Sequence, residues 1–212
     1  MGFITIGDSY RQDLFFLTEE EVDRRFCKEL YEGDYVWFRD FYGYAHSMST
    51  LLGVECPLIG AGPVLMKLFD DGSLANLWGT TLVPEEFKKL KKPLVYIGVY
   101  TPTTTVRTYR MIATLAHEMR HLYQRKIGKK QKRIETGTQS LFDDNEIDAD
   151  AFAMAFMRFQ LSLRFYEILG AVCAGIADYC PPALIKRIHR AIIIYKDFQK
   201  NEVIKKRINK NS

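Results

Sequence analysis

One helical segment carries two histidines and a glutamate at metal-binding spacing, and this segment constrains the fold more than any other part of the chain. Residues 106–126 contain neither glycine nor proline. His117 and His121 lie four residues apart in the run His-Glu-Met-Arg-His, so their side chains are about 40° apart around a helix. Apolar residues recur at helical spacing on the other side: Ile112, Leu115, Met119 and Leu122. The pattern predicts a helix that packs one face in a core and presents two imidazoles to one metal ion.

Glu118 lies between the two histidines and turns toward the same region. Zinc with an open coordination position lowers the pKa of its bound water to about 7. A carboxylate beside that water can take its proton. We therefore expect Zn²⁺ as the cofactor and Glu118 as the general base. The alternative is an ordinary buried helix whose polar residues are satisfied by their neighbours.

A third ligand is expected from a second helical segment, which opens at Asn145, 24 residues after His121. Glu146 and Asp150 share one face of this segment with Ala153. Glu146 can therefore complete the site. Asp150, one turn later, can accept a hydrogen bond from the outer nitrogen of a ligand histidine and fix its tautomer.

The acids around Glu146 also allow other interpretations. Acidic residues are favoured at a helix N-terminus whatever the function, because of the helix dipole. Asp143 is the alternative ligand if Glu146 is not used, and Asp148 projects away from the ligand face and is expected to be a surface acid. On the remaining side, Phe152 and Phe156 are expected in the core.

The two motifs together resemble a known class of metallopeptidases. H-E-x-x-H followed by N-E-x-x-A-D resembles the gluzincins, which bind zinc through two histidines and one glutamate. The stretch from Glu146 to Ala153 also resembles the ImmA/IrrE family, although residues 154–158 lack that family's leucine-rich, proline-ended tail. The resemblance covers residues 94–160. It implies that the zinc ligands are His117, His121 and Glu146. It also implies that Glu118 is the general base and that Asp150 is the hydrogen-bonding partner of His117.

The resemblance also implies a function. ImmA/IrrE-like proteins are cytosolic and cut regulatory proteins, so the expected activity is zinc-dependent endopeptidase cleavage of a protein or peptide substrate such as a transcriptional regulator. Gluzincins often use a downstream histidine or tyrosine to stabilise the oxyanion. His189 is the first candidate for this role, and the alternative is that it is a histidine at the edge of the core. Further candidates are Tyr179, Tyr123 and Tyr166.

Two other classes of function stay open. The first is a zincin-fold binding or regulatory protein without turnover, although the site residues are all intact. The second is a nucleic-acid-associated zinc protein that uses the basic clusters within 126–133 and 205–210, which contribute to the net charge of +4. No helix-turn-helix, zinc-finger or RNP motif accompanies these clusters, so the sequence does not favour nucleic-acid binding. It indicates no oligomeric state.

The expected fold is α+β and zincin-like, with a small mixed or antiparallel sheet over the H-E-x-x-H helix and a mostly helical C-terminal half. We expect a single domain with an N-terminal helix and sheet region (1–105), the two motif helices (106–163) and C-terminal helices (164–212). A helix is expected over 18–31. Further expected elements are a hairpin over 65–82 that supplies the edge strand above the cleft, a short helix over 84–90 and a strand over 94–100.

The remaining patterns concern the C-terminal half and the compartment. Pro181 is expected to start a helix with the apolar stripe Ile185, Ile188, Ile192 and Tyr195. The N-terminus lacks the features of a signal peptide, and residues 168–185 contain an aspartate and two prolines, so no membrane span is expected. The four cysteines lack C-x-x-C spacing, which favours reduced thiols in a cytoplasmic protein over a disulfide pair or a second metal site.

Overall fold

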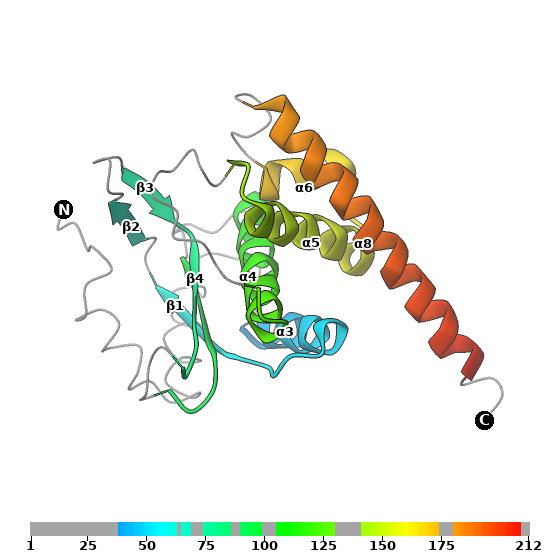
Figure 1. Ribbon diagram of the computed structural model, residues 1–212, viewed down its shortest axis with the longest axis horizontal. Helices are drawn as coiled ribbons and strands as arrows, with labels where there is room; N and C mark the ends of the chain where they lie inside the picture. The colour runs from blue at the N-terminus through cyan, green and yellow to red at the C-terminus, as the bar shows by residue number, and fades with distance from the viewer. Residues whose placement is uncertain are drawn as a thin grey trace.

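The computed structural model describes residues 38–62, 65–68, 74–85, 90–98, 105–129, 141–173 and 180–208. This part of the chain is mixed α+β and mostly helical, as predicted. Its helices are α3 (Phe38–Leu52), α4 (Thr105–Lys126), α5 (Asp144–Leu161), α6 (Phe165–Val172) and α8 (Pro181–Ile208). In Figure 1, α4 lies between the strands on one side and α5, α6 and α8 on the other. The helix expected over 18–31 lies outside the described residues, as do 86–89 of the short helix expected over 84–90.

The described strands form two small sheets. In the first, β5 lies in the centre, parallel to β1 and antiparallel to β4, and in the second β2 pairs antiparallel with β3. The strands are β1 (Leu58–Gly62), β2 (Leu65–Leu68), β3 (Leu74–Leu77), β4 (Gly79–Leu82) and β5 (Leu94–Gly98). The core of the first sheet is β5, whose five residues are all buried.

The predicted hairpin is present, but its second strand is shorter than predicted. β2 and β3 pair with Leu65 opposite Leu77, so the hairpin ends at residue 77 and does not extend to residue 82 as predicted. The chain changes partner at Trp78, whose carbonyl oxygen accepts a hydrogen bond of 2.7 Å from the backbone nitrogen of Gly98. After this residue β4 joins β5 and forms one edge of the described three-stranded sheet. An edge strand from this region, as predicted, therefore lies next to α4.

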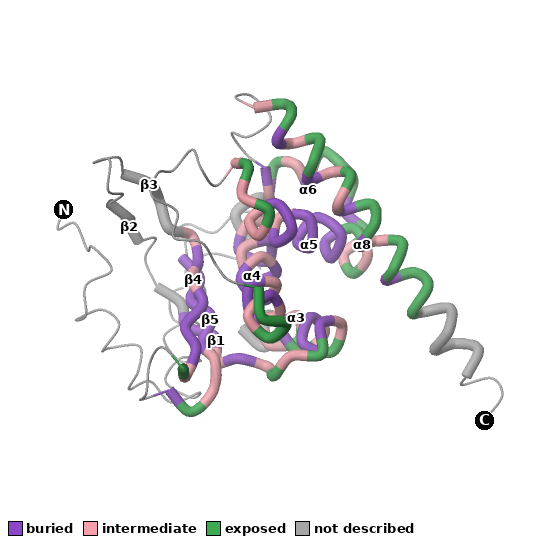
Figure 2. The backbone as a smooth tube through the Cα atoms, in the orientation of Figure 1, coloured by how far each residue is buried: buried purple, intermediate pink, exposed green. Residues whose placement is uncertain are grey.

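α4 is the central helix that the sequence predicts. The four apolar residues of its predicted stripe are all buried. Each such side chain contributes about 1.5–3 kcal/mol to folding through the area that it removes from water. Gly128, with a positive φ of 74°, follows the helix in the left-handed conformation that commonly ends helices. Figure 2 shows α4 and α5 as the most continuously buried helices of the protein.

α5 packs against α4 on one side and α8 on the other. Ala149 and Ala153, both fully buried, allow α5 to approach its neighbours closely. Phe152 and Phe156 are core residues as predicted, and the ring of Phe152 lies perpendicular to that of Phe198 on α8 at a centroid distance of 5.8 Å. The two motif helices are thus fixed relative to each other by a shared core.

α8 begins at Pro181 as predicted, but its most buried face was predicted only in part. Ile188 and Tyr195 of the predicted apolar stripe are partly buried against the core, whereas Ile185 is 51% exposed and Ile192 is 46% exposed, so half of the stripe is confirmed and half was wrong. The most buried face lies roughly a third of a turn away and consists of Ala183, Arg187, Ala191, Ile194 and Phe198. The alanines allow close approach to α5, and an ion pair with Asp150 draws Arg187 inward.

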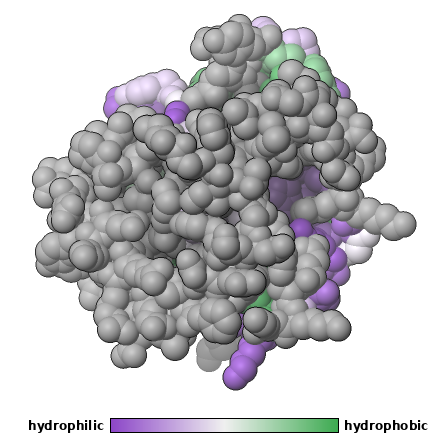
Figure 3. Space-filling model, turned by 90° about the vertical axis from the view of Figure 1, so that its left-hand side faces the viewer, coloured by the Kyte–Doolittle hydropathy of each residue, from purple (hydrophilic) through white to green (hydrophobic). Residues whose placement is uncertain are grey.

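The remaining observations concern membrane-spanning helices, the cysteine thiols and the surface. No described helix combines the length and the apolar character that crossing a membrane requires. Among the described cysteines, Cys56, Cys173 and Cys180 are free thiols, as predicted. Seen from the side of the strands, hydrophilic residues of the described chain lie at the margins of the surface, with a small hydrophobic group at the top (Figure 3).

Candidate metal centre

The structure brings the three predicted ligands together. His117 and His121 on α4 place their Nε2 atoms 2.9 Å apart. The Glu146 carboxylate on α5 lies 3.3 Å from Nε2 of His117 and 3.5 Å from Nε2 of His121. A tetrahedral zinc ion with bonds of about 2.0–2.1 Å holds its ligand atoms roughly 3.3 Å apart. The three side chains therefore fit one such ion with shifts of a few tenths of an ångström.

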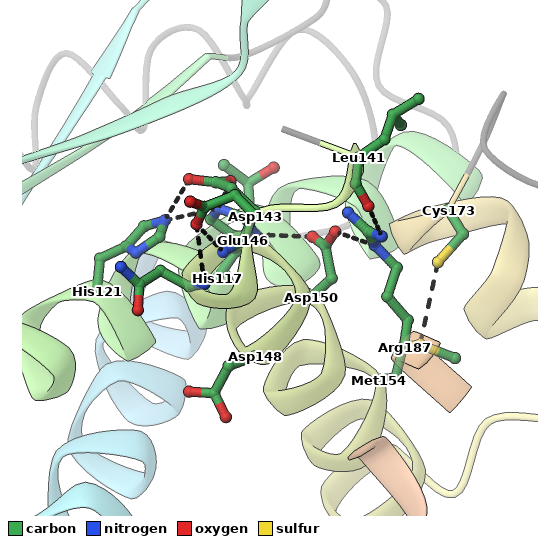
Figure 4. A network of polar contacts seen from close by, with 12 residues as sticks. His117, His121, Leu141, Asp143, Glu146, Asp148, Asp150, Met154, Cys173 and Arg187 are labelled. Carbon is green, nitrogen blue, oxygen red and sulfur yellow. Dashed lines mark hydrogen bonds and ion pairs between the residues drawn. The ribbon is translucent and has the colours of Figure 1, made fainter. Parts of the chain in front are cut away.

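Asp150 holds the outer nitrogen of His117, as predicted. Nδ1 of His117 donates to Oδ1 of Asp150 at 2.8 Å. The other oxygen of Asp150 accepts from Nε of Arg187 at 2.7 Å, and Arg187 is only 1% exposed. Figure 4 shows Asp150 between His117 and Arg187. Arg187 also donates to the carbonyl oxygen of Leu141 at 2.8 Å, so it fixes the start of α5 as well as Asp150.

Gln124 holds the outer nitrogen of His121, a contact that was not predicted from the sequence. Nδ1 of His121 lies 2.8 Å from Oε1 of Gln124, one turn further along α4. The signal was present, because residues three apart on a helix are neighbours. Each ligand histidine therefore has an acceptor on its Nδ1, which leaves Nε2 as the nitrogen available to a metal.

These outer hydrogen bonds leave the cluster able to hold a cation. An ionised carboxylate and an amide oxygen can only accept hydrogen bonds, so each Nδ1 carries the ring proton. The two Nε2 lone pairs then face each other at 2.9 Å, with the Glu146 carboxylate beside them. Such an arrangement is repulsive unless a proton or a metal ion lies among the three groups.

The electrostatics of the metal-free cluster agree with this description. Burial alone would lower the pKa of His117, but the hydrogen bonds and charges of Asp150 and Glu146 outweigh burial and raise that pKa well above 6.5. Burial would raise the pKa of Glu146, but the hydrogen bond and charge of His117, with the charges of His121 and Arg187, lower it to about 2. Both shifts favour the charged forms, a protonated His117 beside an ionised Glu146, and a bound metal ion would take the place of that proton.

Glu118 lies against the edge strand β4. It is buried, and its Oε2 accepts a hydrogen bond of 2.7 Å from the hydroxyl of Thr81. Gly79, two residues earlier on the same face of the strand, leaves room for this carboxylate, because a Cβ atom there would lie 2.9 Å from Cγ of Glu118. No sequence pattern indicated either contact, since both join elements that lie far apart in the chain.

We expect Gly79→Ala to disturb Glu118. The added Cβ would also lie 2.6 Å from Cγ2 of Thr114, so the substitution overpacks the contact between β4 and α4. The expected cost is about 1–3 kcal/mol of unfolding free energy, measured by urea denaturation. Gly43→Ala is the control: nothing lies within 4 Å of a Cβ at Gly43 on α3, and alanine there should stabilise the helix by roughly 0.5–1 kcal/mol. Equal effects of the two substitutions would contradict this packing.

Two acids near Glu146 have structural roles. Asp143, the alternative ligand, caps α5: its Oδ1 accepts from the backbone nitrogens of Asn145 at 2.8 Å and Glu146 at 3.2 Å. Asp148 was expected at the surface, and that prediction was wrong. It is 3% exposed and pairs with Arg120 at 2.8 Å. Burial would raise its pKa, but its bonds to Arg120 and other donors hold the pKa well below the usual range.

Of the four candidates for oxyanion stabilisation, the structure describes three. His189 is exposed on α8, on nearly the opposite side of that helix from the buried Arg187. Tyr166 is 61% exposed, Tyr123 lies under the Arg120 guanidinium at 4.5 Å, and Tyr179 lies outside the described residues. The role predicted for His189 stays a prediction.

The comparisons with known proteins give no relative. No family model matches the chain, and no curated protein or solved structure matches it. The geometry of the cluster is therefore the basis on which a function can be proposed for this protein.

Proposed function

We propose that the protein is a zincin-like metallopeptidase that binds one Zn²⁺ through His117, His121 and Glu146 and hydrolyses peptide bonds. The observation that carries the proposal is the pair of Nε2 atoms 2.9 Å apart, both with acceptors on Nδ1 and both within 3.5 Å of a Glu146 oxygen. A structural zinc site has four protein ligands, whereas the metal-ligating group among the described residues has three members. This number and the presence of Glu118 in the same motif favour a catalytic site over a purely structural one.

The residues of the chain have separate tasks in this reaction. Zinc held by the three residues would supply a Lewis acid that polarises the scissile carbonyl and lowers the pKa of the attacking water. Glu118 would serve as the general base that takes a proton from the attacking water and passes it to the leaving amine. Thr81 holds one oxygen of Glu118, while Asp150 keeps His117 in the tautomer that a metal requires. The edge strand β4 can pair with an extended peptide backbone.

The substrate class follows from the gluzincin and ImmA/IrrE resemblance. We infer a narrow-specificity endopeptidase in the cytoplasm that acts on a regulatory protein. A small cytoplasmic protease with broad specificity would damage its host, so a restricted set of substrates suits this chain.

Removal of the metal provides the test. We expect the protein to cleave members of a proteome-derived peptide library, with new termini identified by mass spectrometry. Dialysis against a zinc chelator should abolish cleavage, and zinc should restore it where magnesium does not, since the ligand set contains two imidazoles. Cleavage that persists in protein with no measurable metal would contradict the mechanism. Stoichiometric zinc without any cleavage would favour the binding-protein alternative.

A further inference from the structure

Gln124 makes contacts that allow its amide only one orientation. The residue is fully buried, and its Oε1 lies 2.8 Å from Nδ1 of His121. Its Nε2 donates to the carbonyl oxygen of Asn145 at 2.9 Å and to Oδ2 of Asp148 at 3.1 Å. Both partners of Nε2 are acceptors, so the reverse orientation would place the amide oxygen against two other oxygens. The amide therefore presents its oxygen to His121.

Asp148 is itself held by charges from two helices. Its Oδ2 accepts from Nε of Arg120 on α4 at 2.8 Å, and its Oδ1 accepts from Arg190 on α8 at 2.8 Å. Asp148 is nearly as buried as the core around it. At a buried position of this kind, apolar residues of similar volume often give the fold as much stability as a buried ion pair. The stability of the fold thus does not by itself require an acid here.

We propose that Gln124 is a positioning residue for the metal ligand His121, and that Asp148, fixed by Arg120 and Arg190, sets the orientation of the Gln124 amide. This inference depends on the proposed metal site and adds to it. His121 is then held with Nδ1 protonated and Nε2 directed to the metal. Oriented ligands bind more tightly because less order is lost on binding.

The arrangement makes α8 part of the metal site. Arg187 and Arg190 lie three residues apart on α8, and each pairs with one acid of α5, namely Asp150 and Asp148. One acid holds His117 directly, and the other holds His121 through Gln124. The orientation of both ligand histidines therefore depends on the docking of α8 against α5.

Gln124→Leu is the first test, because leucine keeps the volume and removes the hydrogen bonds. We expect the zinc dissociation constant, measured by competition with a chromophoric chelator, to rise about 10–100-fold. Proton–nitrogen correlation spectra of the histidine rings should lose the hydrogen-bonded Nδ1–H signal of His121. Gln199→Leu is the matched control: Gln199 is exposed on α8, with its amide bonded to Tyr195, and both readouts should stay unchanged.

Asp148→Asn is the second test and keeps the proposal falsifiable if Gln124→Leu fails to fold. The variant keeps the shape of the side chain, but its amide can no longer impose one orientation on Gln124. We expect weaker zinc binding and a fraction of His121 in the Nε2–H tautomer. Wild-type zinc affinity and an unchanged His121 spectrum in both variants would overturn the proposal. If the wild type binds no zinc, the proposed function fails, while the spectra of the metal-free protein still test the role of Gln124.

Discussion

Replacing Glu118 by glutamine is expected to lower the rate of peptide hydrolysis roughly 10²–10⁴-fold while zinc stays bound. Glutamine keeps the size of the side chain and an oxygen that can accept from Thr81, which lies 2.7 Å from the present carboxylate. It cannot take a proton from water at neutral pH. The measurements are kcat/KM on a cleaved library peptide and zinc content on the same preparation.

Glu55→Gln is the matched control for this variant. Glu55 is exposed between α3 and β1, so the same chemical change there should leave both readouts at their wild-type values. If Glu118→Gln hydrolyses the peptide at the wild-type rate with its zinc in place, Glu118 is not the general base. If zinc is lost as well, the variant has disturbed the metal site and the loss of rate does not support a role in proton transfer.

Replacing Arg187 by methionine is expected to lower the free energy of unfolding by roughly 3–5 kcal/mol. The substitution leaves Asp150 without the guanidinium at 2.7 Å and the Leu141 carbonyl without its donor at 2.8 Å. A charge left uncompensated in the interior is costly, whereas methionine fills most of the volume. Urea denaturation of metal-free protein measures this effect separately from any loss of zinc.

Two further variants identify the cause of that loss. Adding Asp150→Asn to Arg187→Met should recover part of the lost stability, because the unpaired charge is then removed. Arg164→Met, whose side chain is 71% exposed and pairs with Glu167 at 3.5 Å, should change the stability little. An Arg187→Met protein as stable as the wild type would show that the buried pair with Asp150 does not hold α8 against α5.

The three candidate ligands and the partner of His117 were predictable because they depend on local geometry. His117 and His121 are four residues apart on one helix, as are Glu146 and Asp150 on the next. Helical spacing alone places each pair on one face. The approach of the two faces was then inferred from the chemistry of a zinc site, and the structure confirms that the three ligands meet.

The contacts that support the ligands depend on tertiary structure and were mostly not predictable. Asp148 was predicted to be a surface acid because its partners Arg120 and Arg190 lie on other helices. The face of α8 that is most buried was predicted only in part, because hydrophobic periodicity cannot anticipate an arginine that is drawn inward by Asp150. Gln124 is the exception, because its spacing of three residues from His121 is local and the contact could have been predicted from it.

In the strands, too, features that depend on neighbouring residues were predictable, whereas contacts between distant parts of the chain were not. The hairpin of β2 and β3 follows from local turn residues, whereas the change of partner at Trp78 depends on β5. Thr81 and Gly79 could be related to Glu118 only once β4 was placed beside α4. Sequence patterns therefore located the centre of the candidate site, and the structure supplied the residues around it.

Metal content tests the central claim most directly. Elemental analysis of protein purified without a metal-affinity tag should give about one zinc per chain in the wild type, as one three-ligand site implies, and a large loss in His117→Ala and in Glu146→Ala. His46→Ala and Asp144→Ala, which alter an exposed histidine and an exposed acid, should keep the zinc. A wild type without zinc, or zinc that is indifferent to both ligand substitutions, would contradict the account.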